Sequence, residues 1–121
     1  MGLFGRVPSV GASDAVAMVA GGAVLVDVRE KAEWNAGHAP QAVHVPLSRI
    51  DDASDRLGRS SGPLVVVCRS GHRSRIATSR LRKLGLDATN LSGGMPAWAA
   101  AGGALVDRKG RPAGDDERTR R

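Results

Sequence analysis

The chain has 121 residues, of which 41% are hydrophobic, and a formal net charge of +6. This length predicts one domain that buries about two-thirds of its unfolded surface. No apolar run reaches about 18 residues, which excludes a membrane-spanning helix, and the chain does not open with a signal-peptide pattern. The single cysteine cannot form an internal disulfide and suits a reducing compartment, so we expect a cytoplasmic protein.

Basic residues gather near the end of the chain. Six Lys or Arg occur between Arg108 and Arg121, among glycine, proline and acidic residues and without apolar periodicity. This composition predicts a disordered basic tail over residues 107–121. The positive net charge raises the question of nucleic-acid binding. No nucleic-acid partner is expected, because no aromatic residues accompany the basic ones and no nucleic-acid-binding motif occurs.

The first elements are short. Residues 1–8 are expected to form a loose arm, followed by a short edge strand at Ser9-Val10. Ser13 or Asp14 is expected to cap a helix that runs to about Ala20, where two glycines end it.

The apolar run Ala23–Val28 is bounded by glycines on its N-terminal side and predicts a central parallel strand buried on both faces. Asp27 places a charge at the end of this strand. A buried charge needs hydrogen-bond partners, so we expect Asp27 to be a hydrogen-bonded structural anchor.

A short helix over 30–36 follows, and Trp34 is expected to pack in the core. Residues 42–45 predict a further short strand, which a proline ends. The spacing of apolar residues over 47–57, with acidic residues between them, predicts an amphipathic helix.

The only cysteine of the chain lies at the end of a buried-strand pattern. Leu64–Val67 leads to Cys68 and a polar loop, and a helix to about Leu84 follows at once. The loop N–H groups and the helix N-terminus surround such a thiol with partial positive charge. Cysteines in this position beside cations titrate at about 3.5–7.5. The pattern therefore predicts a thiolate nucleophile, although a lone cysteine ending a strand is more often an inert buried thiol.

The last strand is predicted at Asp87–Leu91, and Ser92–Gly94 turns into a final helix that carries Trp98. Strands that alternate with helices predict an α/β fold: a doubly wound, mostly parallel five-stranded sheet with helices on both faces. The reactive loop then lies at the carboxyl end of a strand, where open α/β sheets place their ligands. We expect this domain to cover residues 9–106.

Four segments in this order resemble the motifs of single-domain rhodaneses, the sulfurtransferases that carry a persulfide on cysteine. They are Val26–Glu30 with Glu33-Trp34, Gly37–Pro46, Cys68–Ser74 and Leu91–Trp98. The resemblance covers about residues 9 to 105. One departure is Gln41, which stands where the family usually has glycine, so the local turn is expected to differ.

The resemblance implies a role for each residue of the loop. Cys68 is the implied catalytic residue, and the loop that cradles its persulfide comprises Arg69, Ser70, Gly71, His72, Arg73 and Ser74. Arg69 and Arg73 are expected to orient an anionic donor, since a guanidinium fork suits an oxyanion. Asp27 and Arg29 are implied as supporting residues, and His38 as structural.

The implied reaction moves a sulfane sulfur from a donor such as thiosulfate to cyanide or a thiol through a Cys68 persulfide. It requires no metal and no dissociable cofactor, because the intermediate is the persulfide itself. The implied partners are the small-molecule donor and acceptor, with a sulfur-donor or sulfur-acceptor protein as a further partner and no membrane. A monomer or a homodimer is expected.

Two other functions stay open at this point. Cysteine phosphatases and arsenate reductases also place a cysteine between a strand and a helix. Phosphatase loops resemble C-x5-R, whereas this chain has C-x4-R between Cys68 and Arg73, a loop that suits one sulfur atom better than a tetrahedral oxyanion. A protein-docked persulfide carrier would use the same cysteine, and a regulatory binding module would use the same fold.

Overall fold

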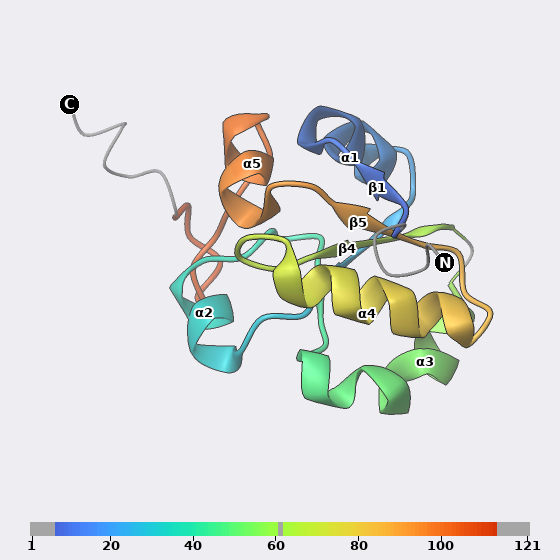
Figure 1. The fold of residues 1–121 in the computed structure, drawn as a ribbon. Helices are drawn as coiled ribbons and strands as arrows, with labels where there is room; N and C mark the ends of the chain where they lie inside the picture. The colour runs from blue at the N-terminus through green and yellow to red at the C-terminus, as the bar shows by residue number, and fades with distance from the viewer. Residues whose placement is uncertain (1–6, 61, 114–121) are drawn as a thin grey trace.

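The sheet has five strands in the order β1-β5-β4-β2-β3, and each neighbouring pair is parallel. The computed structural model describes residues 7–60 and 62–113. The elements are β1 (Ser9–Val10), α1 (Ala12–Ala20), β2 (Val24–Asp27), α2 (Lys31–Ala36), β3 (Val43–His44), the 3-10 turn η1 (Leu47–Arg49), α3 (Ile50–Gly58), β4 (Leu64–Val67), α4 (His72–Lys83), β5 (Ala88–Leu91) and α5 (Gly94–Ala100). Strands and helices alternate along the chain (Figure 1), so the predicted doubly wound α/β fold is confirmed.

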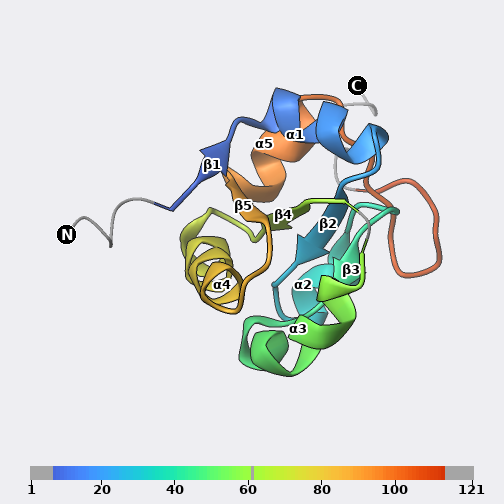
Figure 2. The ribbon, with the colours of Figure 1, turned by 90° about the vertical axis from the view of Figure 1, so that its right-hand side faces the viewer.

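Helices cover both faces of the sheet. α1 and α5 lie on one face, and α3 and α4 lie on the other (Figures 1 and 2). Successive strand residues point to opposite faces, so Leu25 packs with Trp98 on the first face and the adjacent Val26 with Leu81 on the second. Within residues 7–60 and 62–113, no helix has the length and apolar character needed to cross a membrane.

The expected cap of the first helix is wrong. α1 begins at Ala12, and its N-cap is Gly11, whose backbone is extended and which forms no side-chain cap. Ser13 and Asp14 lie inside the first turn and are exposed. Asp14 is still favourable there, because a carboxylate near a helix N-terminus interacts well with the helix dipole.

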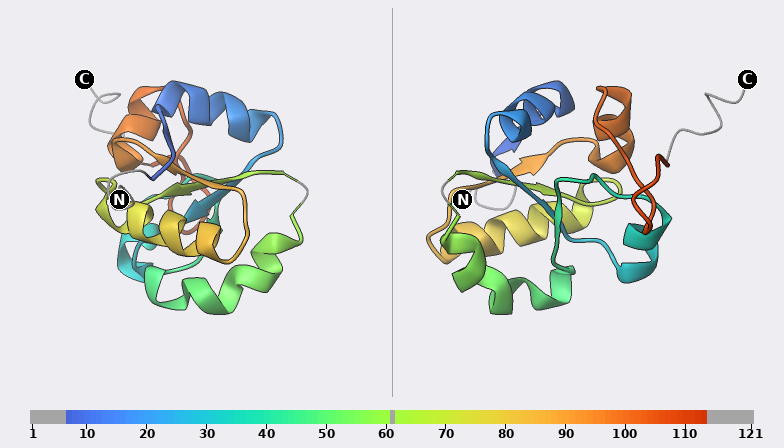
Figure 3. Two further views of the ribbon diagram at one scale, coloured as in Figure 1. Left: turned by 45° about the vertical axis from the view of Figure 1, so that its right-hand side comes forward. Right: turned by 180° about the vertical axis from the view of Figure 1, so that it is seen from behind.

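Trp34 lies outside the core, contrary to the prediction. α2 has no fully buried residue, and in both rear and front views it lies beyond the end of the sheet (Figures 1 and 3). The indole is partly buried between two imidazoles, with ring centroids 3.7 Å from His38 and 4.7 Å from His44. His38 Nδ1 also bonds to the Trp34 carbonyl at 2.9 Å, which fits the structural role implied for His38.

The segment after α5 is ordered further than predicted. Val106 pairs with His38 and with Pro112, and the Asp107 N–H donates to the Arg111 carbonyl at 2.7 Å. Figure 3 shows this red segment passing from α5 toward α2. Residues 107–113, the first part of the tail predicted over 107–121, therefore take part in this hydrogen-bonded structure. Residues 114–121 lie outside the described residues, as do residues 1–6 of the predicted arm.

Candidate active site

Cys68 follows β4 directly, and its thiol is free and buried, with 1% of the residue exposed. The loop reaches α4 through Gly71, whose φ of +108° is a conformation that glycine adopts readily and other residues rarely adopt. This turn brings the Gly71 N–H within 3.0 Å of Cys68 Sγ, to which it donates a hydrogen bond. The sulfur thus lies against backbone donors at the N-terminus of a 12-residue helix.

A second turn, between β5 and α5, braces the loop. The Met95 N–H donates to the Cys68 carbonyl at 2.9 Å. Gly94 lies so close to the loop that a Cβ at this position would overlap the carbonyl oxygen of Arg69. The position of the Cys68 loop therefore depends on a glycine more than 20 residues away in the sequence.

A chain of hydrogen bonds, buried as far as Asn90, leads from Cys68 to the edge of the sheet. The thiol donates to Ser74 Oγ at 3.4 Å, and the Ser74 hydroxyl donates to Asn90 Oδ1 at 2.6 Å. Asn90 Nδ2 in turn donates to Ser9 Oγ on β1 at 3.2 Å. Ser74 and Asn90 are buried, whereas Ser9 is exposed. Asn90 was not predicted from the sequence, although an amide inside a strand of the sheet is a signal that it has a buried partner.

Ionisation of Cys68 is coupled to this chain of hydrogen bonds. Burial acts to raise the pKa of the thiol, but hydrogen bonds from the Ser74 side chain and from the N–H groups of Ser74, Gly71 and Ser70 outweigh it. The pKa of Cys68 therefore lies below its ordinary value. The Ser74 hydroxyl has one hydrogen, so it can donate either to the thiolate or to Asn90 Oδ1. Forming the thiolate consequently draws this hydrogen away from Asn90.

Replacing Ser74 by alanine should raise the pKa of Cys68, because the thiolate loses a hydrogen-bond donor while its burial remains. The pH dependence of thiolate ultraviolet absorbance measures this directly, since the chain has one cysteine and no tyrosine. Ser79→Ala, five residues further along α4, is the matched control and should leave the midpoint unchanged. An unchanged midpoint in Ser74→Ala as well would contradict the assigned role.

Arg73, the second arginine of the loop, is held in an ion pair. Its guanidinium forms a bidentate ion pair with Glu33 on α2, with N–O distances of 2.7 and 2.9 Å. The Arg73 hydrogen bond holds the pKa of Glu33 at about 2, and the same contact raises the pKa of Arg73. Through this pair Arg73 ties α2 to the start of α4. The donor-orienting role expected of Arg73 stays a prediction.

The Glu33–Arg73 pair should make stability depend on pH between about 2 and 4.5. The pKa of Glu33 falls from an ordinary 4.5 to about 2 on folding. The contribution of ionised Glu33 to the free energy of unfolding is therefore fully present above the ordinary pKa of 4.5 and is lost as the pH falls toward 2. Thermal unfolding across this range should show a shallower decline in Tm for Glu33→Gln than for the wild type. Asp55→Asn, an exposed carboxylate on α3 outside any ion pair of the described residues, serves as control.

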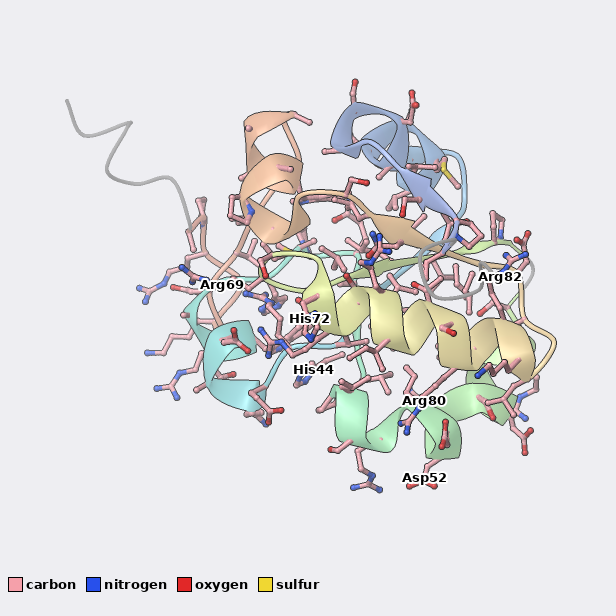
Figure 4. All side chains as sticks on the ribbon, in the orientation of Figure 1. His44, Asp52, Arg69, His72, Arg80 and Arg82 are labelled. Carbon is pink, nitrogen blue, oxygen red and sulfur yellow. The ribbon has the colours of Figure 1, made fainter. Side chains whose placement is uncertain are left out.

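The other loop side chains face outward. Arg69, Ser70 and His72 are exposed, and Figure 4 shows Arg69 and His72 on the outer side of the loop. Arg69 borders a cavity of about 380 Å³, whose lining includes Met95 and Leu105. Among residues 7–60 and 62–113 Arg69 forms no ion pair. Of the two arginines expected to orient a donor, it is the one with an available guanidinium.

Asp27 and Arg29 form a buried ion pair beside the loop. The Arg29 guanidinium donates to both carboxylate oxygens, at 2.9 and 2.7 Å, and also to the Gly37 carbonyl at 2.8 Å. The Asp27 side chain is fully buried, and that of Arg29 is 8% exposed. This arrangement agrees with the anchoring role expected of Asp27 and fixes the segment that follows β2.

A family model described as the rhodanese-like domain matches residues 12–101, which include the Cys68 loop and the Gly94 turn. The chain belongs to the rhodanese-like domain family. Its relatives include the putative sulfurtransferase YtwF of Bacillus subtilis, which is 39% identical over 74 residues, or 61% of this chain and 71% of YtwF. The adenylyltransferase and sulfurtransferase UBA4 of Yarrowia lipolytica is 34% identical over 77 residues, 63% of this chain. This rhodanese-like chain spans only 19% of the length of UBA4.

Solved rhodanese-like structures have the same fold. The solution structure of the rhodanese-like domain of the Anabaena protein Alr3790 superposes with a TM-score of 0.74 at 27% identity. The match covers 92% of this chain and 89% of that domain. The described residues contain no group of three or more His, Cys, Asp or Glu side chains placed to hold a metal ion.

Proposed function

We propose that this rhodanese-like domain is a sulfurtransferase that carries a sulfane sulfur on Cys68 as a persulfide. The observation that supports it is the position of Sγ, which accepts a hydrogen bond from the Gly71 N–H at 3.0 Å at the start of α4. These donors lower the pKa of the thiol, and the thiolate is the nucleophilic form of cysteine. The names of its relatives, which include putative sulfurtransferase, support the same chemistry.

In the first step the Cys68 thiolate attacks the outer sulfur of thiosulfate. The new S–S bond takes the electron pair of the thiolate, and the bond between the two thiosulfate sulfurs breaks with its pair going to sulfite. Cys68 then holds a persulfide anion. Loop N–H groups stabilise this anion, and Arg69 attracts the dianionic donor to the mouth of the site.

In the second step a nucleophile takes the outer sulfur. Cyanide forms thiocyanate, or a thiolate forms a new persulfide, and the S–S bond electrons return to Cys68 as thiolate. No dissociable cofactor or metal takes part in either step. Two half-reactions through one covalent intermediate predict ping-pong kinetics. We place this chemistry in the cytoplasm, a reducing compartment that suits a chain with one cysteine.

Thiocyanate formation from thiosulfate and cyanide tests the proposal. We expect turnover by the wild type and none by Cys68→Ser. Mass spectrometry of the thiosulfate-treated wild type should show the gain of one sulfur atom, which cyanide then removes. A wild type that never gains sulfur contradicts the proposal and leaves the binding-module alternative.

A protein-docked persulfide carrier is the second candidate. The observation that favours it is the exposed, cation-rich side of α4, which begins at the Cys68 loop. A persulfide acquired from a protein donor, without turnover of thiosulfate, would support the carrier.

A further inference from the structure

The outward side of α4 forms a continuous surface that begins at the Cys68 loop. Residues three, four, seven, eight and eleven positions after His72 share one side of a helix with it. The surface, called the α4 face here, consists of His72, Arg75, Ile76, Ser79, Arg80 and Lys83. With Val7 these residues line a hollow of about 640 Å³. In Figure 4 His72 lies at the loop end of α4, and Arg80 lies further along the helix.

The α4 face is strongly cationic. α4 contains five Lys or Arg and no acidic residue. Arg73 is paired with Glu33, and Arg82 donates to the Ala88 carbonyl. In contrast, Arg75, Arg80 and Lys83 form no ion pair within the described part of the chain. Protein surfaces usually mix both signs of charge, as α3 does with three aspartates and an arginine.

Helix stability does not explain all of these charges. Arg80 and Lys83 lie in the last turn of α4, where cations interact favourably with the helix dipole. Arg75 lies near the start of α4, where the same dipole disfavours a cation. The Arg75 cation therefore interacts unfavourably with the helix dipole. Like the neighbouring Cys68 loop, the Arg75 guanidinium favours an anionic ligand.

An apolar side chain lies in the middle of the cations. Ile76 is 40% exposed, and in the described residues only Leu84 is a comparably exposed large hydrophobic side chain. A small anionic donor such as thiosulfate makes no favourable contact with an isoleucine on the outside of the helix. Protein interfaces combine an apolar centre with a polar rim. Proteins that bind single-stranded nucleic acids instead stack the bases on aromatic side chains. The α4 face has no Phe, Tyr or Trp.

We propose that the α4 face docks an acidic protein surface, with an apolar side chain opposite Ile76, on the protein that exchanges sulfur with Cys68. This inference rests on the persulfide chemistry proposed above. From His72 to Lys83 the face is about 16 Å long at 1.5 Å per residue, enough for a short acidic segment. A segment bound along it would place its end at the Cys68 loop, next to His72.

Binding is tested first without chemistry, in the full-length Cys68→Ser protein. The probe is a twelve-residue peptide with four glutamates, a central leucine and a terminal cysteine, compared with a peptide in which glutamine replaces each glutamate. We expect the acidic peptide to bind about tenfold more tightly at low ionic strength, and to lose this advantage in high salt. Replacing the leucine of the peptide by serine should weaken binding of the acidic peptide, and so should Ile76→Ser in the protein.

Charge-neutral variants locate the binding surface without risking the helix. The combined Arg75→Gln, Arg80→Gln and Lys83→Gln protein should lose the preference for the acidic peptide. The matched control changes three exposed cations elsewhere, Arg56→Gln, Arg59→Gln and Lys109→Gln, and should keep it. An equal loss of this preference in both proteins would show only an effect of net charge and would overturn the proposal.

Sulfur transfer is measured next with the thiosulfate-loaded wild type. The ratio of transfer to the acidic peptide thiol over transfer to a small neutral thiol should fall about tenfold in the α4-face variant. Loading with sulfur but no preference for the acidic peptide overturns the docking proposal and leaves the sulfurtransferase intact. Failure to load contradicts the sulfurtransferase, while the binding assay still decides whether the face docks an acidic segment.

A single-stranded RNA of equal charge distinguishes the class of partner. If it binds the α4 face more tightly than the acidic peptide, and Ile76→Ser changes neither, the face is a nucleic-acid surface and the proposal is wrong. If RNA binds more weakly and the serine variant weakens peptide binding, an acidic protein is the partner.

Discussion

Replacing Gly94 by alanine should lower the free energy of unfolding by about 3 kcal/mol. Gly94 has a φ of +67°, a left-handed conformation that costs an alanine about 1–2 kcal/mol. The added Cβ would also overlap the Arg69 carbonyl oxygen and press on the backbone of Cys68. Forcing packed groups apart costs about 1–3 kcal/mol more. Urea unfolding of both proteins measures the difference.

Gly102→Ala is the matched control. Gly102 has a φ of +94°, but a Cβ added there would meet no heavy atom within 4 Å. It should show only the conformational cost of about 1–2 kcal/mol. Gly94→Ala should in addition raise the pKa of Cys68, because displacement of the loop moves the donors that stabilise the thiolate. Equal losses of stability and an unshifted Cys68 titration in both variants would contradict the bracing role of Gly94.

The second large effect is expected at the buried ion pair beside the loop. Asp27→Asn removes the negative charge and leaves the Arg29 guanidinium buried without a counter-ion. Removing one partner of such a pair costs about 3–5 kcal/mol. The free energy of unfolding from urea titration is the measurement, and the activity of the remaining folded protein shows whether the loop depends on the pair.

Asp52→Asn is the comparison, since the Arg49–Asp52 pair is about 70% exposed on both sides. An exposed pair contributes about 0–1 kcal/mol, so this variant should be nearly as stable as the wild type. The double change Asp27→Leu with Arg29→Leu should cost less than Asp27→Asn, because no unpaired charge remains. A small effect of Asp27→Asn, similar to that of Asp52→Asn, would rule out the anchoring role.

The fold was predictable because its signals are local. Apolar runs bounded by glycine or proline marked β2 and β4, and the helical spacing after the loop marked α4. The environment of Cys68 was predictable for the same reason, since strand, loop and helix are consecutive in the chain. The N-cap of the first helix was not predictable, because Gly11 precedes the helix with an extended backbone and no side-chain hydrogen bond caps it.

The contacts that were missed join residues far apart in the sequence. Arg73 pairs with Glu33 at a separation of 40 residues, and Asn90 reaches Ser9 at a separation of 81. Neither spacing leaves a periodic pattern. Trp34 was predicted in the core, whereas α2 lies past the sheet end, and the indole stacks instead on His38, which follows α2, and on His44 of β3.

The outermost strands of the sheet are only two residues long, β1 on one side and β3 on the other. Pro8 directly precedes β1 and has no N–H to offer. An incoming extended chain therefore finds almost no ladder to extend at either edge, which protects the domain from edge-to-edge aggregation. The same feature disfavours recognition by strand addition, and leaves helices and loops as the parts of this domain through which other proteins recognise it.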